Sequence, residues 1–300
     1  MVKSKLIFLA LLFFQLENQA KAQSKSFLRQ QIDSIVANKK AFVGISIMGD
    51  DGKDTLSING SHRFPLQSVF KFHIGLTVLS RVKEGKLSLD QQIKIEQKDL
   101  LPGLHSPLRE KYPQGATLPL SEILRYTISQ SDNVGCDILI KLLGGPPVVE
   151  RYFLANGYND VAIKINEEVM QNNWNLQFQN WTTPKAASEV LAAFYKNEKK
   201  YLTKEHHKFI WDIMKGTETG KDRLKGLLPA GAVVAHKTGS SGANKEGLIA
   251  AVNDIGIVFL PKGRYYIISV FVTDSREDLK TCEKLIAEVS KASWDYFVKK

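Results

Sequence analysis

Apolar positions along the chain repeat with two different periods, and the change of period divides the sequence into three parts. Residues 42–48 and 54–59 are strand-like and flank the turn Gly49-Asp-Asp-Gly52, which predicts a β-hairpin. From residue 68 to about 200 apolar residues mostly recur every three or four positions, as on one face of a helix. This spacing predicts helices near 68–84, 121–128, 133–143, 146–156 and 185–196. Strand-like runs return at 232–236, 255–260 and 265–273.

Two further amphipathic segments, 23–40 and 279–289, predict helices at the two ends of the chain. Strands at both ends with helices between them predict an α/β (α+β) fold. We expect one antiparallel sheet, flanked by helices and built from both termini, with an all-helical domain inserted. Residues 23–63 and 215–300 would form an α/β sandwich, and residues 64–214 the helical domain. Ligand sites tend to lie where two such parts meet.

Residues 1–22 predict a removable secretory signal peptide. Lys3 and Lys5 precede the apolar run 6–14, and Ala20-Lys21-Ala22 supplies the small residues of a cleavage site. This run is far shorter than the ~20 residues of a membrane helix, and no cysteine follows it to carry a lipid. A buried N-terminal helix, the alternative, would leave the lysines and the A-x-A sequence without a role. We expect export to the periplasm without a membrane anchor.

The chain carries 41 Lys and Arg against 31 Asp and Glu, a formal net charge of +10. Proteins that bind nucleic acid cluster their basic residues on one face or along a helix. Here the densest basic run, 196–200, is interrupted by Glu198. We therefore expect a soluble basic surface and no nucleic-acid partner. Cys136 lies in an apolar helical stretch, which favours a free, buried thiol over a disulfide with Cys282.

Three short motifs offer candidate chemistry. In Ser68-Val-Phe-Lys71, positions i and i+3 share a helix face, so the Lys71 amine can reach the Ser68 hydroxyl and remove its proton. The copy Ser80-Arg-Val-Lys83 lies on a different face of the same helix, and we expect it to be structural. Ser131-Asp-Asn133 falls between two predicted helices and, taken alone, would be a helix N-cap. Lys237-Thr-Gly239 follows a predicted strand and, taken alone, would be a turn.

In this order, the three motifs resemble those of the serine β-lactamase and penicillin-binding-protein superfamily. The resemblance covers essentially the whole mature chain, and the chain is similar to class A β-lactamases. The segments 64–71, 131–137, 179–182 and 223–229 resemble the PER/VEB-type extended-spectrum branch. The resemblance implies an α/β sandwich with a helical domain, as predicted above, and an Ω-loop near 165–181.

The resemblance also implies a role for individual residues. The catalytic set would be Ser68 as nucleophile, Lys71 or Glu167 as its base, and Ser131 as proton donor to the lactam nitrogen. The substrate-binding set would be His105, Asn133, Gln171, Arg223, Lys237, Thr238 and Ser240. Arg223 would replace the arginine that many class A enzymes carry on a later strand, which is missing near Asn253.

The segment Glu167-Glu168-Val169-Met170-Gln171 would separate a lactamase from a transpeptidase. An ester on Ser68 hydrolyses slowly unless a carboxylate activates water, and Glu167 fits the position of that base better than Glu168. Gln171 stands where the family usually has Asn. The Arg–Asp pair that clips this loop in many class A enzymes is Ile165 and Asn180 here. We expect an altered or looser loop and a wider cleft for bulky cephalosporins.

The sequence therefore predicts hydrolysis of the β-lactam amide of penicillins and cephalosporins through a Ser68 acyl-enzyme. Two alternatives stay open: a penicillin-binding D,D-peptidase acting on peptidoglycan, and a non-catalytic penicillin-sensing or cell-wall-binding domain. The six His form neither an H-x-H-x-D nor an H-E-x-x-H pattern, which argues against a zinc enzyme. We expect no metal, no cofactor and a monomer.

Overall fold

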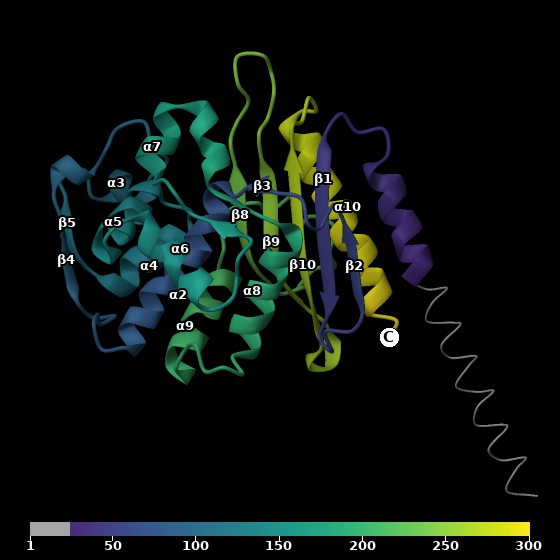
Figure 1. Ribbon diagram of the computed structural model, residues 1–300, viewed down its shortest axis with the longest axis horizontal. Coiled ribbons are helices and arrows are strands. Elements are labelled where there is room, and N and C mark those ends of the chain that lie inside the picture. The colour runs from purple at the N-terminus through teal and green to yellow at the C-terminus, as the bar shows by residue number, and fades with distance from the viewer. Residues whose placement is uncertain (1–24) are drawn as a thin grey trace, which may run out of the picture.

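The computed structural model describes residues 25–300, so the predicted signal peptide, residues 1–22, lies outside the described residues. At its centre is a five-stranded sheet in the order β2-β1-β10-β9-β8 (Figure 1). The strands are β1 (Phe42–Gly49), β2 (Thr55–Ile58), β8 (Val234–Ser240), β9 (Val252–Phe259) and β10 (Tyr265–Thr273). All four pairings are antiparallel, and β1 pairs with β10 along its whole length. The predicted sheet built from both termini is confirmed.

Helices cover both faces of this sheet. The helix at 25–36 and α10 (Leu279–Phe297) pack on one face, and α8 (Pro184–Lys196) packs against β1 and β10 on the other (Figure 1). Side chains alternate between the two faces of a strand. Accordingly Tyr266 and Ile268 of β10 join the core beneath α10, whereas Ile267 joins the core shared with the helical part. The sheet thus separates two hydrophobic cores.

The segment between the hairpin and β8 is mostly helical and is centred on α2 (Phe70–Lys83). α2 is buried from Phe70 to Ser80, and the short 3₁₀ turn η1 (Gln67–Val69) leads into it. Around it lie α3 (Pro107–Lys111), α4 (Leu120–Ser129), α5 (Asn133–Leu143), α6 (Pro146–Ala155), α7 (Glu167–Asn172) and α9 (Lys204–Lys215). The other short elements are β3 (Phe64–Pro65), β4 (Gln92–Ile95), β5 (Ala116–Pro119), β6 (Val161–Ala162), β7 (Trp181–Thr182), η2 (Gln97–Asp99), η3 (Trp174–Gln179) and η4 (Pro261–Gly263).

The structure changes several of the sequence-based elements, and two of these changes concern β8 and α9. The strand predicted at 232–236 continues to Ser240, so the motif Lys237-Thr-Gly239 lies inside β8 and not in a turn after it. The helix α9 was not predicted, although Thr203 caps its start by accepting a hydrogen bond from the backbone of His206. Cys136 and Cys282 are both free and buried, as the sequence favoured for Cys136.

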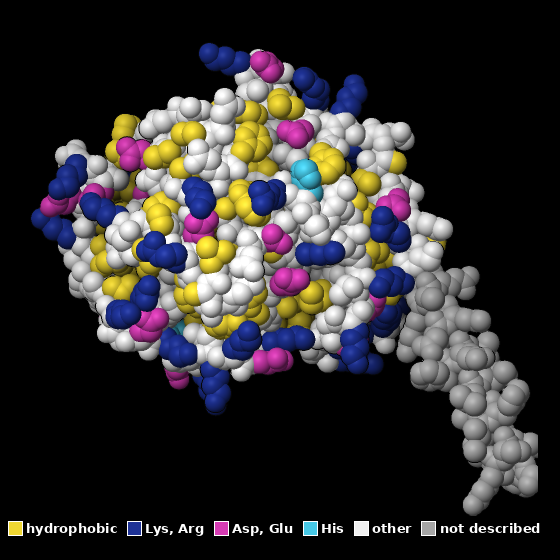
Figure 2. Space-filling model, in the orientation of Figure 1, with side chains coloured by type: hydrophobic (Ala, Val, Ile, Leu, Met, Phe, Trp, Pro, Cys, Tyr) yellow, Lys and Arg dark blue, Asp and Glu magenta, His cyan; other side chains and the backbone are white. Residues whose placement is uncertain are grey.

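Charged side chains are dispersed over the surface. In the face drawn in Figure 2, Lys and Arg are interspersed with Asp and Glu and do not gather into one basic patch. Within residues 25–300, no helix combines the length and the apolar composition that a membrane crossing requires.

The strand β3, which leads into the 68–71 motif, packs directly over a glycine of the sheet. A Cβ at Gly44 would lie 2.3 Å from the Phe64 ring and 2.8 Å from Pro184. Phe64 is fully buried, with its ring centroid 5.7 Å from that of Phe271. Only a glycine at position 44 therefore allows β3 to reach its place over the sheet.

We predict that Gly44→Ala destabilises the fold, because the added methyl group must displace the Phe64 ring. Overpacking of this kind typically costs about 2 kcal/mol, which lowers the melting temperature of a chain of this size by ~5 °C. Gly216→Ala is the matched control, since a Cβ there meets only ordinary contacts of 3.4 and 3.5 Å. Equal melting temperatures of the two variants would contradict this account of β3.

Candidate active site

Ser68 lies in η1, between β3 and the start of α2. Two contacts from opposite sides hold this segment: Leu66 donates its amide to the Asn180 carbonyl at 2.9 Å, and the Asn253 side-chain amide donates to the Pro65 carbonyl at 2.8 Å. Gln67 has a φ of 46°, in the left-handed region that non-glycine residues rarely adopt. Such a conformation costs on the order of 1–3 kcal/mol and is often kept at functional sites.

Lys71 lies at the centre of the site and is completely buried. Its Nζ is 2.7 Å from Ser68 Oγ, 3.0 Å from the Ser131 carbonyl, 2.6 Å from Asn133 Oδ1 and 2.5 Å from Glu167 Oε1. Four oxygens compete for the three N–H bonds of an ammonium. The arrangement therefore compensates the burial of the cation and lets Lys71 exchange a proton with Ser68 or with Glu167.

The turn between α4 and α5 supplies Ser131, and the first residue of α5 supplies Asn133. Ser131 has a φ of 59°, which lets its carbonyl face Lys71 while its hydroxyl accepts a hydrogen bond of 2.9 Å from Lys237 Nζ. Asp132, between them, caps α5 by accepting from the Gly135 amide at 2.7 Å. The N-cap expected for this motif taken alone is thus provided by Asp132, and its two neighbours point to the site.

The strand β8 forms the opposite wall. Lys237 is fully buried, and burial lowers the pKa of its ammonium well below the usual range, an effect to which the nearby Lys71 cation adds. A Cβ at Gly239 would lie 2.6 Å from the Leu66 carbonyl and 3.3 Å from the Ser68 nitrogen. The glycine of the third motif therefore lets β8 approach the serine segment closely.

Arg223 reaches β8 and β9 from the segment that precedes them. Its Nη1 donates to the carbonyls of Gly239 (3.1 Å) and Asn253 (2.9 Å), and its Nη2 donates to Ser240 Oγ at 2.6 Å. Its Nε pairs with Glu283 at 3.2 Å. The guanidinium thus lies against the backbone of Asn253. Thr238 Oγ1 lies 2.6 Å from Thr219 Oγ1, on the same side of the site.

Two side chains hold the loop that carries Glu167. Asp137 of α5 accepts the backbone amides of Glu167 (2.8 Å) and Glu168 (2.9 Å). Asn180 accepts the amide of Ile165 at 3.1 Å and returns a bond of 2.9 Å to the Ile165 carbonyl. The neutral Asn180 side chain thus holds the loop at Ile165, where these two residues cannot form an Arg–Asp ion pair. The loop directs Glu167, which is only 6% exposed, toward Lys71 and Ser68.

The predicted rim residues lie at the edge of the site. His105 is exposed and its Nε2 lies 3.0 Å from the Gln130 carbonyl; Gln171 is exposed beside Gly103.

A cavity of about 250 Å³ opens above Ser68 and is lined by Gln67, Ser68, Asn133, Glu167, Met170, Gln171, Trp174, Gln177, Ser240 and Ser241. Three larger hollows, of about 650, 590 and 280 Å³, contain none of the predicted site residues, so the convergence of reactive groups identifies the cavity at Ser68.

The structure therefore brings Ser68, Lys71, Ser131, Glu167 and Lys237 into one hydrogen-bonded cluster. Sequence reasoning did not single out Asp137, although its spacing of four residues from Asn133 places both on one face of α5. Burial raises the pKa of the Asp137 carboxyl to about 7, which the two backbone amides partly oppose.

Comparison with known proteins gives consistent matches over the whole chain. The family described as "Beta-lactamase enzyme family" matches residues 26–297. The chain is 46% identical to "Beta-lactamase VEB-1" of Pseudomonas aeruginosa, covering 100% of this chain and 99% of that protein. It is 43% identical to "Extended-spectrum beta-lactamase PER-1" of the same organism, with 94% and 91% covered. The crystal structure of a β-lactamase from Chitinophaga pinensis, 48% identical, matches 89% of this chain and 98% of that chain with a TM-score of 0.87.

We predict that Asp137 makes stability depend on pH. Its pKa is about 7 in the folded chain against an ordinary value of 3.8, so between these values the folded chain binds more protons than the unfolded one. Stability should then fall as pH rises through this range and stay low above pH 7. Urea unfolding at pH 5 and pH 8 should show a loss about 2 kcal/mol larger in the native chain than in Asp137→Asn. Parallel pH curves for the two proteins would contradict the assignment.

Proposed function

Because the chain belongs to the β-lactamase enzyme family, near the VEB and PER branch of class A, we propose that it hydrolyses penicillins and cephalosporins through an acyl-enzyme on Ser68. The observation that carries the proposal is the position of Lys71 Nζ, 2.7 Å from Ser68 Oγ and 2.5 Å from Glu167 Oε1. Lys71 thus lies within hydrogen-bond distance of both the proposed nucleophile, Ser68, and the second proposed base, Glu167. The name of the PER-1 relative supports an extended-spectrum substrate range.

In the first step Ser68 Oγ attacks the β-lactam carbonyl and its proton passes to Lys71, or through water to Glu167. The backbone N–H groups of Ser68 and Ser240, which border the same cavity, would stabilise the oxyanion, and a single such donor is typically worth about 3 kcal/mol. The C–N bond then breaks, and Ser131 supplies a proton to the lactam nitrogen. The bond from Lys237 to Ser131 Oγ supports this transfer, because a cation beside the hydroxyl favours release of its proton.

The substrate carboxylate would bind at β8, to Thr238, Ser240, Lys237 and Arg223. Charge-assisted hydrogen bonds of this kind are about twice as strong as neutral ones. Asn133 would contact the acylamide side chain of the substrate, and His105 and Gln171 would contact it from the rim. Gln171 lines the cavity, and the His105 carbonyl accepts a hydrogen bond of 2.9 Å from the Asn133 amide, which supports this role.

In the second step Glu167 removes a proton from water, which attacks the ester carbonyl and releases Ser68. The hydrogen bond that Asp137 accepts from the Glu167 amide and the burial of the Glu167 carboxylate support this role, because they fix Glu167 beside the ester. A penicillin-binding D,D-peptidase would use the same three motifs without this step. Turnover of the acyl-enzyme therefore distinguishes the two functions.

The cellular setting is part of the proposal. We propose that residues 1–22 direct export to the periplasm and that the mature chain acts there as a monomer.

We also propose two domains. The sandwich comprises residues 23–63 and 215–300, and the helical domain comprises residues 64–214, with α8 of the helical domain covering one face of the sheet.

Replacing the nucleophile should abolish turnover. We expect Ser68→Ala to reduce kcat/KM for a chromogenic cephalosporin by at least about 10⁴-fold, as for other enzymes that lose a nucleophile. Ser80→Ala is the matched control, since Ser80 belongs to the second S-x-x-K copy in α2 and donates only to the Thr77 carbonyl at 2.8 Å. A folded Ser68→Ala enzyme with near-native activity would refute the nucleophile assignment.

Replacing the deacylating base should trap the intermediate. We expect Glu167→Gln to acylate and then hydrolyse the ester at least about 10²-fold more slowly, because general base catalysis typically contributes that much. Mass spectrometry would then show a persistent adduct of the antibiotic's mass. Glu168→Gln is the control and should deacylate at the native rate. If Glu168→Gln accumulates the adduct and Glu167→Gln does not, the two roles are reversed.

A further inference from the structure

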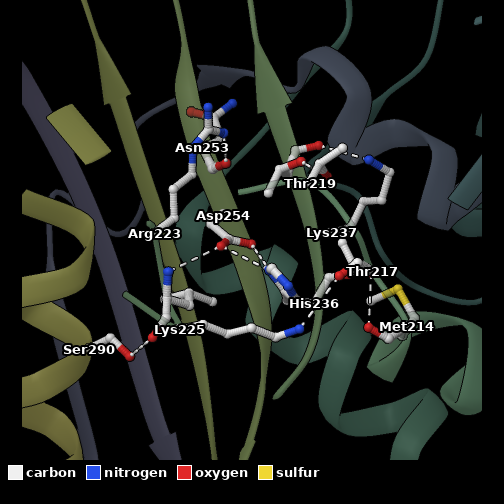
Figure 3. A network of polar contacts seen from close by, with 12 residues as sticks. Met214, Thr217, Thr219, Arg223, Lys225, His236, Lys237, Asn253, Asp254 and Ser290 are labelled. Carbon is white, nitrogen blue, oxygen red and sulfur yellow. Dashed lines mark hydrogen bonds and ion pairs between the residues drawn. The ribbon is translucent and has the colours of Figure 1, made fainter. Parts of the chain in front are cut away.

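A histidine–aspartate pair is buried behind the wall of the cleft formed by β8 and β9. His236 Nδ1 lies 2.9 and 3.0 Å from the two carboxylate oxygens of Asp254, and both residues are 0% exposed. His236 directly precedes Lys237, so its side chain points to the other face of the sheet from that of Lys237 (Figure 3). A buried carboxylate is costly unless donors compensate it. Here the imidazole is one such donor.

The second donor to Asp254 comes from the segment that carries Arg223. The Leu224 amide donates to Asp254 Oδ2 at 3.2 Å, and the Leu224 carbonyl accepts from Ser290 Oγ at 2.8 Å (Figure 3). The backbone next to Arg223 is therefore fixed on both sides, by β9 through Asp254 and by α10 through Ser290. Thr217 Oγ1 in turn donates to the His236 carbonyl at 2.6 Å.

Arg223 itself is held so that one donor stays available. A guanidinium has five N–H groups, and the bonds to Glu283, Gly239, Asn253 and Ser240 use four of them. The fifth, on Nη2, lies beside Ser240 at the border of the cavity. Because Ser240 Oγ accepts from Arg223, its own O–H is free to donate to a ligand. The position of Arg223 thus determines where two donors lie: the fifth N–H of Arg223 and the O–H of Ser240, at the part of β8 proposed to bind the substrate carboxylate.

We propose that His236 and Asp254 are a positioning pair for substrate recognition: His236 orients the Asp254 carboxylate, which holds the Leu224 amide and thereby aims Arg223 and Ser240 at the substrate carboxylate. The proposal rests on the carboxylate-binding role of Arg223 given above and extends it to two residues that do not touch the substrate. A small displacement of the backbone at Leu224 would move the guanidinium away from the cleft wall. The pair therefore acts on substrate affinity and leaves the chemistry at Ser68 intact.

The test replaces the histidine by two residues that differ in one hydrogen bond. His236→Phe keeps an aromatic ring but removes the donor to Asp254, whereas His236→Asn places an amide N–H where Nδ1–H stands. We expect His236→Phe to raise the KM of a cephalosporin about tenfold, the effect of one lost hydrogen bond to a charged group, with kcat within about twofold of native. His236→Asn should restore KM to within about threefold of native. Melting temperatures establish that each variant is folded, and Asp254→Asn replaces His236→Phe if that variant does not fold.

Two further comparisons show whether the effect passes through Arg223. In an Arg223→Ala background His236→Phe should change KM by less than about twofold, because interacting residues are not additive. The methyl ester of the same cephalosporin, which lacks the carboxylate, should be equally insensitive. The positioning role alone is overturned if His236→Phe still raises KM as strongly in either comparison. It is also overturned if a folded His236→Phe enzyme has the native KM while Arg223→Ala raises KM. If Arg223→Ala itself leaves KM unchanged, the carboxylate-binding role of Arg223 is wrong and the proposal falls with it.

Discussion

The site depends on the burial of one ammonium group, that of Lys71. A charge removed from water must be surrounded by acceptors, and the four oxygens around Lys71 come from separate parts of the chain: η1, the turn before α5, α5 itself and α7. Satisfying this one cation therefore fixes the positions of Ser68, of Asn133 and of Glu167 together. The same requirement explains why the loop of Glu167 is anchored to α5 and why Ser131 keeps a strained backbone.

Much of the fold followed from periodicity. The hairpin at 42–59, the strand at 265–273 and the last helix were predicted from alternation and from three-to-four spacing, and the antiparallel sheet from both termini is confirmed. The three motifs converge in the structure. Ser68 and Lys71 meet as predicted, because positions i and i+3 lie on one face of a helical segment, whereas Lys237 lies inside β8 and not after the predicted strand. Local sequence determines local geometry of this kind directly.

The features that sequence reasoning did not provide depend on contacts between distant segments. Nothing local predicts the positive φ of Gln67 and Ser131, which tertiary packing imposes. The loop was expected to be altered because Ile165 and Asn180 cannot form an ion pair, yet Asn180 bonds the backbone of Ile165 in both directions. The pairing of His236 with Asp254, 18 residues apart, follows from the register of β8 and β9. Such contacts become visible only when the strands are placed side by side.

We propose that the fixed Glu167 carboxylate frees Ser68 from its acyl ester, so that the enzyme turns over. The most direct measurement is a crystal structure of the native enzyme with a slowly hydrolysed β-lactam attached to it. We expect an ester on Ser68 Oγ and an ordered water that is hydrogen-bonded to Glu167 and faces the carbonyl carbon of the ester. A covalent adduct on another residue, or a Glu167 side chain turned out to solvent with no water beside the ester, would contradict it.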